Sequence, residues 1–257
     1  MLFVILTIIT YVAAILWIAP TIIKTNTNKP NTTVILGFGI LAVLLHFITL
    51  SNQLSTMFGF RLTIINVVSF ICLLMSLMMT FAITKWKTSL LPLLVIYILS
   101  IVSVALSGVI TGETAKYFSQ NISLLFHISI AMLSYAMFFI ALLYVFQLKW
   151  IDIKLKNKQL SFNSHLPPLM TVERHLFSLT FIAQVLLTLT LITGIIYLPQ
   201  VFSNNQIHKT VFSFMAWIIY AMLLFGQWKL HWRGKRVLIY SISGMILLTV
   251  GYFGSRI

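Results

Sequence analysis

Acidic residues are almost absent from this sequence. Three of its 257 residues are acidic, Glu113, Asp152 and Glu173, and all three lie outside the long apolar runs. A proton relay, a hydrolytic acid/base pair or a cation cage within a membrane requires carboxylates inside the membrane. The sequence therefore gives little support to ion pumping or hydrolysis, and we expect that the protein is not an enzyme.

Cysteine and charge are also scarce. The single cysteine, Cys72, lies within an apolar run, so the sequence has no internal disulfide, no CxxC redox pair and no CxxCH haem-attachment site. This excludes c-type cytochromes and thiol oxidoreductases. Charged residues make up 8% of the chain and hydrophobic residues 60%, whereas soluble domains are about one quarter charged. The chain is therefore predicted to be a membrane protein, with no nucleic-acid partner.

Long apolar runs predict an all-α fold with eight transmembrane helices. The runs lie at about 1–23, 34–52, 62–84, 88–110, 122–148, 176–199, 211–228 and 237–254, each near the roughly 20 residues that a spanning helix needs. No internal repeat is visible, and we predict a single membrane domain over residues 1–257. Within it, the connection 149–175 is predicted to lie on the cytoplasmic membrane surface, with Thr171 and Glu173 capping the sixth helix.

Basic residues predict the orientation of the helices. Of the 17 lysines and arginines, thirteen fall in one set of alternate loops, and the other set holds the remaining four, Arg61, Lys116, Lys209 and Arg256. Cytoplasmic loops of membrane proteins carry an excess of lysine and arginine. This places the larger set in the cytoplasm and both termini outside, so that the net charge of +14 is interpreted as charge that orients the helices.

This orientation sorts the histidines by depth. His46 lies about six residues from the outer end of the second helix and His127 about five from the outer end of the fifth, so both lie about 8–9 Å below the outer surface. His208 lies in the outer loop before the seventh helix. The other three are expected in cytoplasmic loops or helix ends, where a solvated or interfacial role is expected: His165, His175 and His231.

Two interpretations of the buried histidines are open. Small residues lie beside each of them at helical spacing: Gly39, Ala42 and Thr49 near His46, and Ser123, Ala131 and Ser134 near His127. Either the rings hydrogen-bond to backbones or hydroxyls across a close helix contact, or neutral imidazole ligates a haem iron. In the second case the four outer cations are available for the haem propionates, and otherwise they are interfacial anchors.

Several stretches resemble one family. The segment "FHISIAMLSYAMFFIALLYVFQL" (126–148) resembles the helix that opens with an external histidine in cytochrome c assembly proteins of the CcsA and CcmC type. The segment "HWRGKRVLIYSISGMILLTVGYFGSRI" (231–257) is similar to that family's penultimate loop and last helix. The YpjD-like inner-membrane branch is the closest in "WIDIKLKNKQLSFNSHLPPLMTVERHLF" (150–177), "VLLTLTLITGIIY" (185–197) and "NVVSF" (66–70).

The resemblance implies a multi-pass protein of the bacterial inner membrane that binds and handles haem near the outer leaflet. By resemblance, His127 holds the position of the family's first external histidine. We expect non-covalent haem b with His127 as one ligand, His46 as the second because it shares the same depth, and His208 as the alternative. Arg61 is expected at the propionates, and Trp217 is expected to contact the haem. Expected partners are membrane lipid, haem and other membrane or cytochrome-maturation proteins.

The chain also differs from the family pattern. The segment "YLPQVFSNNQIHKTVFSFMAW" replaces the family's tryptophan-rich loop, and only Trp217 matches its trailing tryptophan. Gly226 stands where the family has a histidine in the seventh helix, and no second external histidine follows the last helix up to Ile257. These differences favour an alternative, a membrane subunit or transporter accessory that retains the fold without a cofactor. A b-type redox cytochrome would need two ligand pairs at two depths, and the sequence offers one.

Overall fold

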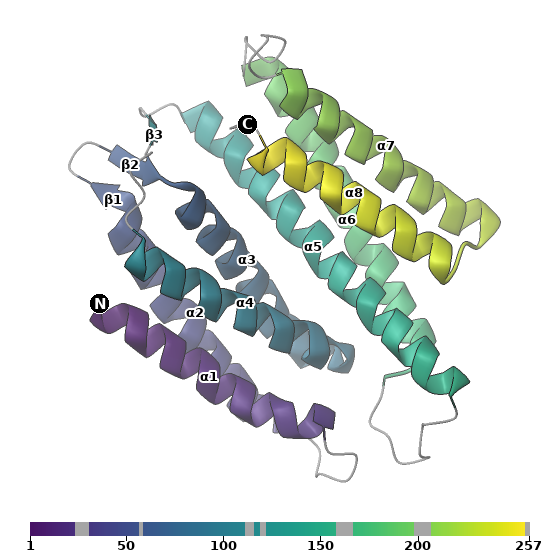
Figure 1. The fold of residues 1–257 in the computed structure, drawn as a ribbon, viewed down its shortest axis with the longest axis horizontal. Coiled ribbons are helices and arrows are strands. Elements are labelled where there is room, and N and C mark those ends of the chain that lie inside the picture. The colour runs from purple at the N-terminus through teal and green to yellow at the C-terminus, as the bar shows by residue number, and fades with distance from the viewer. Residues whose placement is uncertain are drawn as a thin grey trace. The chain divides into compact units, whose positions relative to one another are not determined.

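The computed structural model describes residues 1–23, 31–56, 59–110, 116–118, 122–157, 167–197 and 207–254. Within these ranges, eight helices are long and apolar enough to cross a membrane (Figure 1). They are α1 (Leu2–Ile23), α2 (Thr32–Leu54), α3 (Ile64–Lys85), α4 (Leu90–Val109), α5 (Ile122–Lys156), α6 (Leu169–Tyr197), α7 (Ile207–Leu230) and α8 (Lys235–Phe253). The predicted all-α fold with eight spanning helices is confirmed, and the direction in which they cross the membrane stays a prediction.

The helices fall into two compact units, which we describe separately. Unit 1 contains α1 to α4, and unit 2 contains α5 to α8. In each unit four consecutive helices pack in a ring, each against the next and the fourth against the first. The single domain over residues 1–257 stays a prediction.

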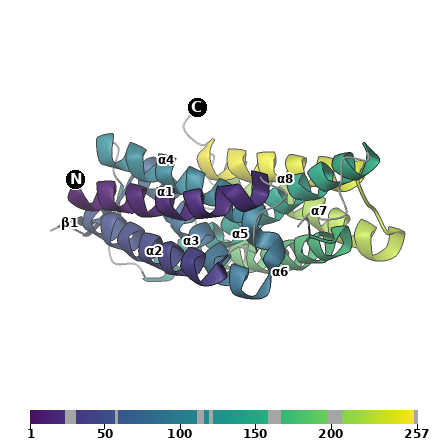
Figure 2. The same ribbon diagram turned by 90° about the horizontal axis from the view of Figure 1, so that it is seen from below.

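Small residues let the helices of unit 1 approach closely. Helix α1 lies against both α2 and α4 (Figures 1 and 2). At Gly39 of α2, a Cβ atom would lie 2.7 Å from Cγ2 of Thr80 on α3 and would collide with the hydroxyl of Tyr97 on α4. Because glycine leaves this space open, the Thr80 and Tyr97 hydroxyls meet in a buried hydrogen bond of 2.8 Å.

A small antiparallel sheet in unit 1 was not expected from the sequence. It has the order β1-β2-β3 and is formed by β1 (Ser55–Thr56), β2 (Gly59–Leu62) and β3 (Lys116–Phe118). Its register pairs Arg61 with Tyr117, and Leu62 with Lys116. Two of the predicted outer cations, Arg61 and Lys116, therefore lie on neighbouring strands at the end of unit 1 where α2 ends and α3 begins.

Aromatic rings and small residues form the core of unit 2. Phe138 of α5 stacks on Tyr220 of α7, with ring centroids 3.8 Å apart and an angle of 19° between the planes. On α8, Gly244 leaves room for the Tyr220 ring, because a Cβ atom there would lie 2.7 Å from its Cε2. The Ser134 hydroxyl of α5 donates to the Ala183 carbonyl of α6 at 3.1 Å. The row of small residues near His127 thus serves, in part, a close helix contact.

Helix α5 is longer than its apolar run. It continues past Leu148 to Lys156. In this extension Asp152 lies 3.7 Å from the Lys149 ammonium and 3.1 Å from that of Lys156, on the turns before and after it. Opposite charges spaced three and four residues apart stabilise a helix outside the hydrocarbon. The first part of the predicted surface connection is therefore a continuation of α5.

Helices α6 and α7 begin at Leu169 and Ile207, earlier than the predicted starts at 176 and 211. Helix α6 starts at Leu169, directly after Pro168, whose carbonyl accepts hydrogen bonds from the next turn. Proline is tolerated at a helix start because its missing N–H would have no partner there. The predicted cap at Thr171 and Glu173 is wrong, since both residues already lie within the helix. The centre of the predicted connection, residues 158–166, lies outside the described residues.

Candidate functional site

His127 lies near the start of α5 and faces α6. Its ring is half-buried, and its Nδ1 lies 2.9 Å from the hydroxyl oxygen of Thr193 on α6. The Thr193 hydroxyl directs its one proton to the backbone carbonyls one turn earlier, those of Leu189 at 2.8 Å and Thr190 at 3.1 Å. Its oxygen is then an acceptor, so the proton in the contact with His127 is on Nδ1. In a neutral imidazole this leaves the lone pair on Nε2.

The His127 ring lies against the backbone of α6. A Cβ atom on Gly194 would be 3.2 Å from Cε1 of the ring, closer than most such contacts. Within the described part of the chain, the Nε2 atom of His127 makes no hydrogen bond. The ring is therefore held by one nitrogen and one edge, and its second nitrogen keeps a free lone pair. Histidines that bind a metal commonly have this arrangement, because a hydrogen bond at one ring nitrogen fixes the orientation of the other ring nitrogen.

His208 lies at the same end of unit 2. Helices α5 and α7 both begin at this end, and we call it the histidine end after His127 and His208. His208 is exposed and lies in the first turn of α7, so its predicted place in a loop is wrong by a few residues. Lys209 follows it on the same turn. Part of the segment that replaces the tryptophan-rich loop, residues 198–206, lies outside the described residues, as do His165 and Arg256.

Trp217 joins α7 to α6. Its indole Nε1–H donates to the Thr188 hydroxyl oxygen at 2.9 Å, and its carbonyl accepts from the Gln184 side-chain amide at 3.1 Å. Phe214 lies parallel to the indole, with ring centroids 5.9 Å apart. These contacts give Trp217 a role in helix packing. Its predicted contact with a cofactor stays a prediction.

His46 lies in unit 1 and is fully buried. Its Nδ1 is 3.1 Å from the Tyr11 hydroxyl, and its Nε2 is 2.9 Å from the Ser69 hydroxyl. Tyr11 donates its proton to Ser76 at 3.0 Å, and Ser76 donates to the Leu73 carbonyl at 2.9 Å. The hydrogen bonds therefore run in one direction, from Ser69 through the imidazole to Tyr11 and on to a backbone carbonyl.

Both ring nitrogens of His46 are therefore occupied. To bind a metal, its Nε2 would have to give up the hydrogen bond from Ser69, and a buried hydroxyl would lose its acceptor. The arrangement matches the interpretation in which the ring is hydrogen-bonded across a helix contact. Its role as second ligand stays a prediction. Within their own units, His127 has one ring nitrogen without a hydrogen-bond partner among the described residues, whereas both ring nitrogens of His46 have one.

The sequence did not reveal how the turn between α7 and α8 folds. Trp232 packs back on Gly226, where a Cβ atom would lie 2.7 Å from Cζ3 of the indole. Its N–H donates to the Gly226 carbonyl at 3.1 Å. Next to it, the Arg233 guanidinium pairs with the largely buried Glu173 carboxylate of α6 at 2.9 Å. The only signal for this pair was an acidic residue in an otherwise basic segment.

Metal clusters were also considered. Across the described ranges, no three histidine, cysteine, aspartate or glutamate side chains are grouped closely enough to hold a metal ion. Haem iron takes one or two protein ligands, so its fit depends on single histidines.

Several known proteins are similar to this chain in sequence. Inner membrane protein YpjD of Escherichia coli strain K12 is 36% identical over 257 residues, which cover 99% of this chain and 97% of that protein. Cytochrome c biogenesis protein CcsA of Prochlorococcus marinus strain MIT 9515 is 26% identical over 153 residues, 51% of this chain and 49% of that protein. No solved structure gives a significant match. With its eight apolar helices, this chain is a multi-pass protein of the bacterial inner membrane. Because the family model described as "Cytochrome C assembly protein" matches residues 34–257, the chain belongs to that family.

Proposed function

We propose that this protein binds haem non-covalently at the histidine end of unit 2 and handles it in cytochrome c assembly, with His127 as an axial ligand. The observation that carries the proposal is the free Nε2 of His127, whose tautomer is set by Thr193. Bound haem would supply an iron that binds a neutral imidazole nitrogen, and His127 would provide that nitrogen. Family membership supports the setting, since a relative is named as a cytochrome c biogenesis protein.

His208 is the better candidate for the second ligand. It belongs to the same unit as His127 and lies at the same end, whereas His46 would have to break its bond from Ser69. Lys209, beside His208, would meet a propionate, and the predicted role of Arg61 at a propionate stays a prediction. A cationic side chain next to the iron site would neutralise the carboxylates that haem carries.

The charge distribution supports a site near the outer leaflet. In unit 2, Lys209 is the one described basic residue near the histidine end, and the opposite end carries Lys149, Lys154, Lys156, Arg174, Lys229, Arg233, Lys235 and Arg236. We call this opposite end the basic end. The excess of basic residues favours the cytoplasm for it. At about 1.5 Å per residue, five residues of α5 place His127 about 8 Å below the outer surface.

The experiment compares haem binding by the wild type and single histidine variants. Each protein is purified in detergent, titrated with haem and measured by its Soret absorbance and reduced spectrum. We expect His127→Gln to lose high-affinity binding, His208→Gln to change the spectrum of the bound haem, and His46→Gln to keep it. His231→Asn is the control, because His231 is exposed at the basic end with a φ of 49°, which asparagine tolerates.

A rescue experiment separates ligation from folding. In His127→Gly, added imidazole should restore the wild-type spectrum if the only missing part is the ligand. The proposal is wrong if the wild type binds no haem when haem is supplied in excess, or if His127→Gln binds haem as tightly as the wild type. A loss in His46→Gln, with a folded protein, would instead make His46 the partner of His127.

A second candidate is a membrane subunit or transporter accessory that keeps the fold without a cofactor. The observation that favours it is that His46 and Trp217 both have structural partners, so two of the residues expected at the haem fill packing roles. A wild type that is folded and monodisperse, but gives no Soret band with excess haem, would select this candidate.

A further inference from the structure

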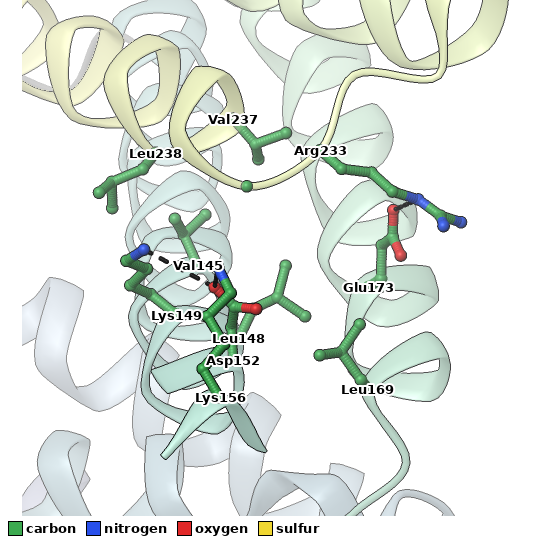
Figure 3. Close-up of a pocket in the computed structure, with 11 residues that line it drawn as sticks. Val145, Leu148, Lys149, Asp152, Lys156, Leu169, Glu173, Arg233, Val237 and Leu238 are labelled. Atoms are coloured by element: carbon green, nitrogen blue, oxygen red, sulfur yellow. Dashed lines mark hydrogen bonds and ion pairs between the residues drawn. The ribbon is translucent and has the colours of Figure 1, made fainter. Parts of the chain in front are cut away.

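A pocket lies at the basic end of unit 2. Its volume is about 290 Å³, and it is formed by the last turns of α5, the first turns of α6 and the turn that leads into α8 (Figure 3). Val145 and Leu148 on α5 and Val237 and Leu238 on α8 form an apolar wall, while charged side chains line the rest. The pocket therefore offers an apolar and a charged surface to the same ligand.

The charges in the pocket are not balanced. On α5, one carboxylate, that of Asp152, serves two ammonium groups, those of Lys149 and Lys156. These two lysine side chains remain 40% and 71% exposed. Across the pocket, Arg233 binds the Glu173 carboxylate through Nε. One positive charge is therefore left over on the α5 side, where an anion would be bound.

The start of α8 adds to this preference for an anion. Helix α8 begins after Gly234, which lines the pocket and provides no side-chain cap, and the first turn holds no acidic residue. The first N–H groups of a helix have no partner within it and favour negative charge. Gly234 and Val237 line the pocket, so the start of α8 lies beside the lysines of α5.

The surroundings of the pocket are typical of a membrane interface. Three cations at the basic end lie over tryptophan rings: Lys154 over Trp150 at 4.0 Å, Lys229 over Trp228 at 4.9 Å and Arg236 over Trp232 at 5.6 Å. Tryptophan is enriched where helices leave the hydrocarbon. Helix α5 has 35 residues, about 50 Å in length, and therefore extends beyond a hydrocarbon core of about 30 Å. Its last turns, with the pocket, belong to the headgroup region.

We propose that this pocket binds the phosphate of an anionic phospholipid, with Lys149 and Lys156 as the main contacts and an acyl chain along Val145 and Leu238. The apolar wall distinguishes such a lipid from a free phosphate, which has no apolar part. The net positive charge distinguishes it from a zwitterionic lipid. The site lies at the end of unit 2 opposite His127 and is independent of haem binding.

The test measures binding of fluorescent phosphatidylglycerol to the full-length protein in detergent. The variant Lys149→Gln/Lys156→Gln removes two charges from the pocket. Its matched control, Lys154→Gln/Lys229→Gln, removes two charges from the same end, where both lysines lie over tryptophan rings outside the pocket. We expect the pocket variant to weaken binding on the order of tenfold, and the control to change it by less than about twofold.

A second variant tests the apolar wall without a change of charge. Leu238→Trp would fill the pocket and should weaken phosphatidylglycerol binding while leaving the thermal stability of the protein close to that of the wild type. Equal weakening in the pocket variant and its control would mean that general surface attraction holds the lipid, and would overturn the proposal.

Two competitors identify the source of the phosphate. Unlabelled phosphatidylglycerol should displace the probe, whereas phosphatidylcholine and inorganic phosphate at the same concentration should not. Displacement by inorganic phosphate as effective as that by the lipid would make the pocket a site for free anions. Displacement by phosphatidylcholine as effective as that by phosphatidylglycerol would show that the charge does not select the lipid. Either result contradicts the proposal.

Discussion

The hydrogen bond between Thr193 and His127 offers a direct test of the proposed role of His127 as a haem ligand. Replacing Thr193 with valine keeps the shape of the side chain and removes the oxygen that lies 2.9 Å from Nδ1. The Nδ1–H then has no acceptor, and the ring is free to change tautomer or rotate. Haem affinity should fall, because Nε2 is no longer held with its lone pair outward.

The size of the effect follows from the burial of the ring. Leaving a buried donor unsatisfied costs about 1–3 kcal/mol. Because His127 is only half-buried, water recovers part of this, and we expect about 1.4 kcal/mol, which is a tenfold loss of affinity. This lies at the lower end of the roughly 10- to 100-fold losses seen when the partner of a ligand histidine is removed.

The assay is a haem titration of the purified apo-protein in detergent, followed at the Soret band. Thr188→Val is the matched control, since Thr188 lies on the same helix and accepts a ring N–H, that of Trp217, at the same distance of 2.9 Å. Thr193→Ser should restore most of the affinity. The reasoning is refuted if Thr193→Val binds haem like the wild type, or if Thr188→Val loses as much affinity.

Three further predictions concern packing and orientation. Gly226→Ala should lower the free energy of unfolding by about 1–3 kcal/mol, because the new methyl group would collide with the Trp232 indole. Gly37→Ala is the control and should not lower it, because the space around Gly37 is open. Thermal unfolding in detergent compares the two variants. Ser69→Ala should cost about 1–3 kcal/mol, because the buried imidazole of unit 1 loses the donor to its Nε2, and an unchanged melting temperature would contradict this. A reporter fused after Ile257 should be active outside the cytoplasm and one inserted near Ser164 inside, and the opposite result would reverse the predicted depths of the histidines.

The sequence by itself determined the number of the long helices that can span the membrane. Each of the eight apolar runs is long enough to cross the membrane, and this depends on composition within the run alone. The family could be recognised for a similar reason, since its motifs are local strings such as the one that begins at Phe126. The ends of α5 and α6 were less predictable. In α5, Lys149, Asp152 and Lys156 mark where the chain leaves the hydrocarbon, but the ion pairs between these side chains extend the helix beyond that point.

Tertiary structure alone decided which hydrogen-bond partners the histidines have. In residue type, depth and small neighbours His46 and His127 were alike in the sequence, and only the family resemblance favoured His127. They differ because partners from distant parts of the chain reach them: Tyr11 and Ser69 occupy both nitrogens of His46, whereas Thr193 occupies one nitrogen of His127. Local patterns cannot report such contacts, since they form only when the helices pack. The physical difference between a structural histidine and a candidate ligand is one free lone pair, and helix packing determines where that lone pair remains.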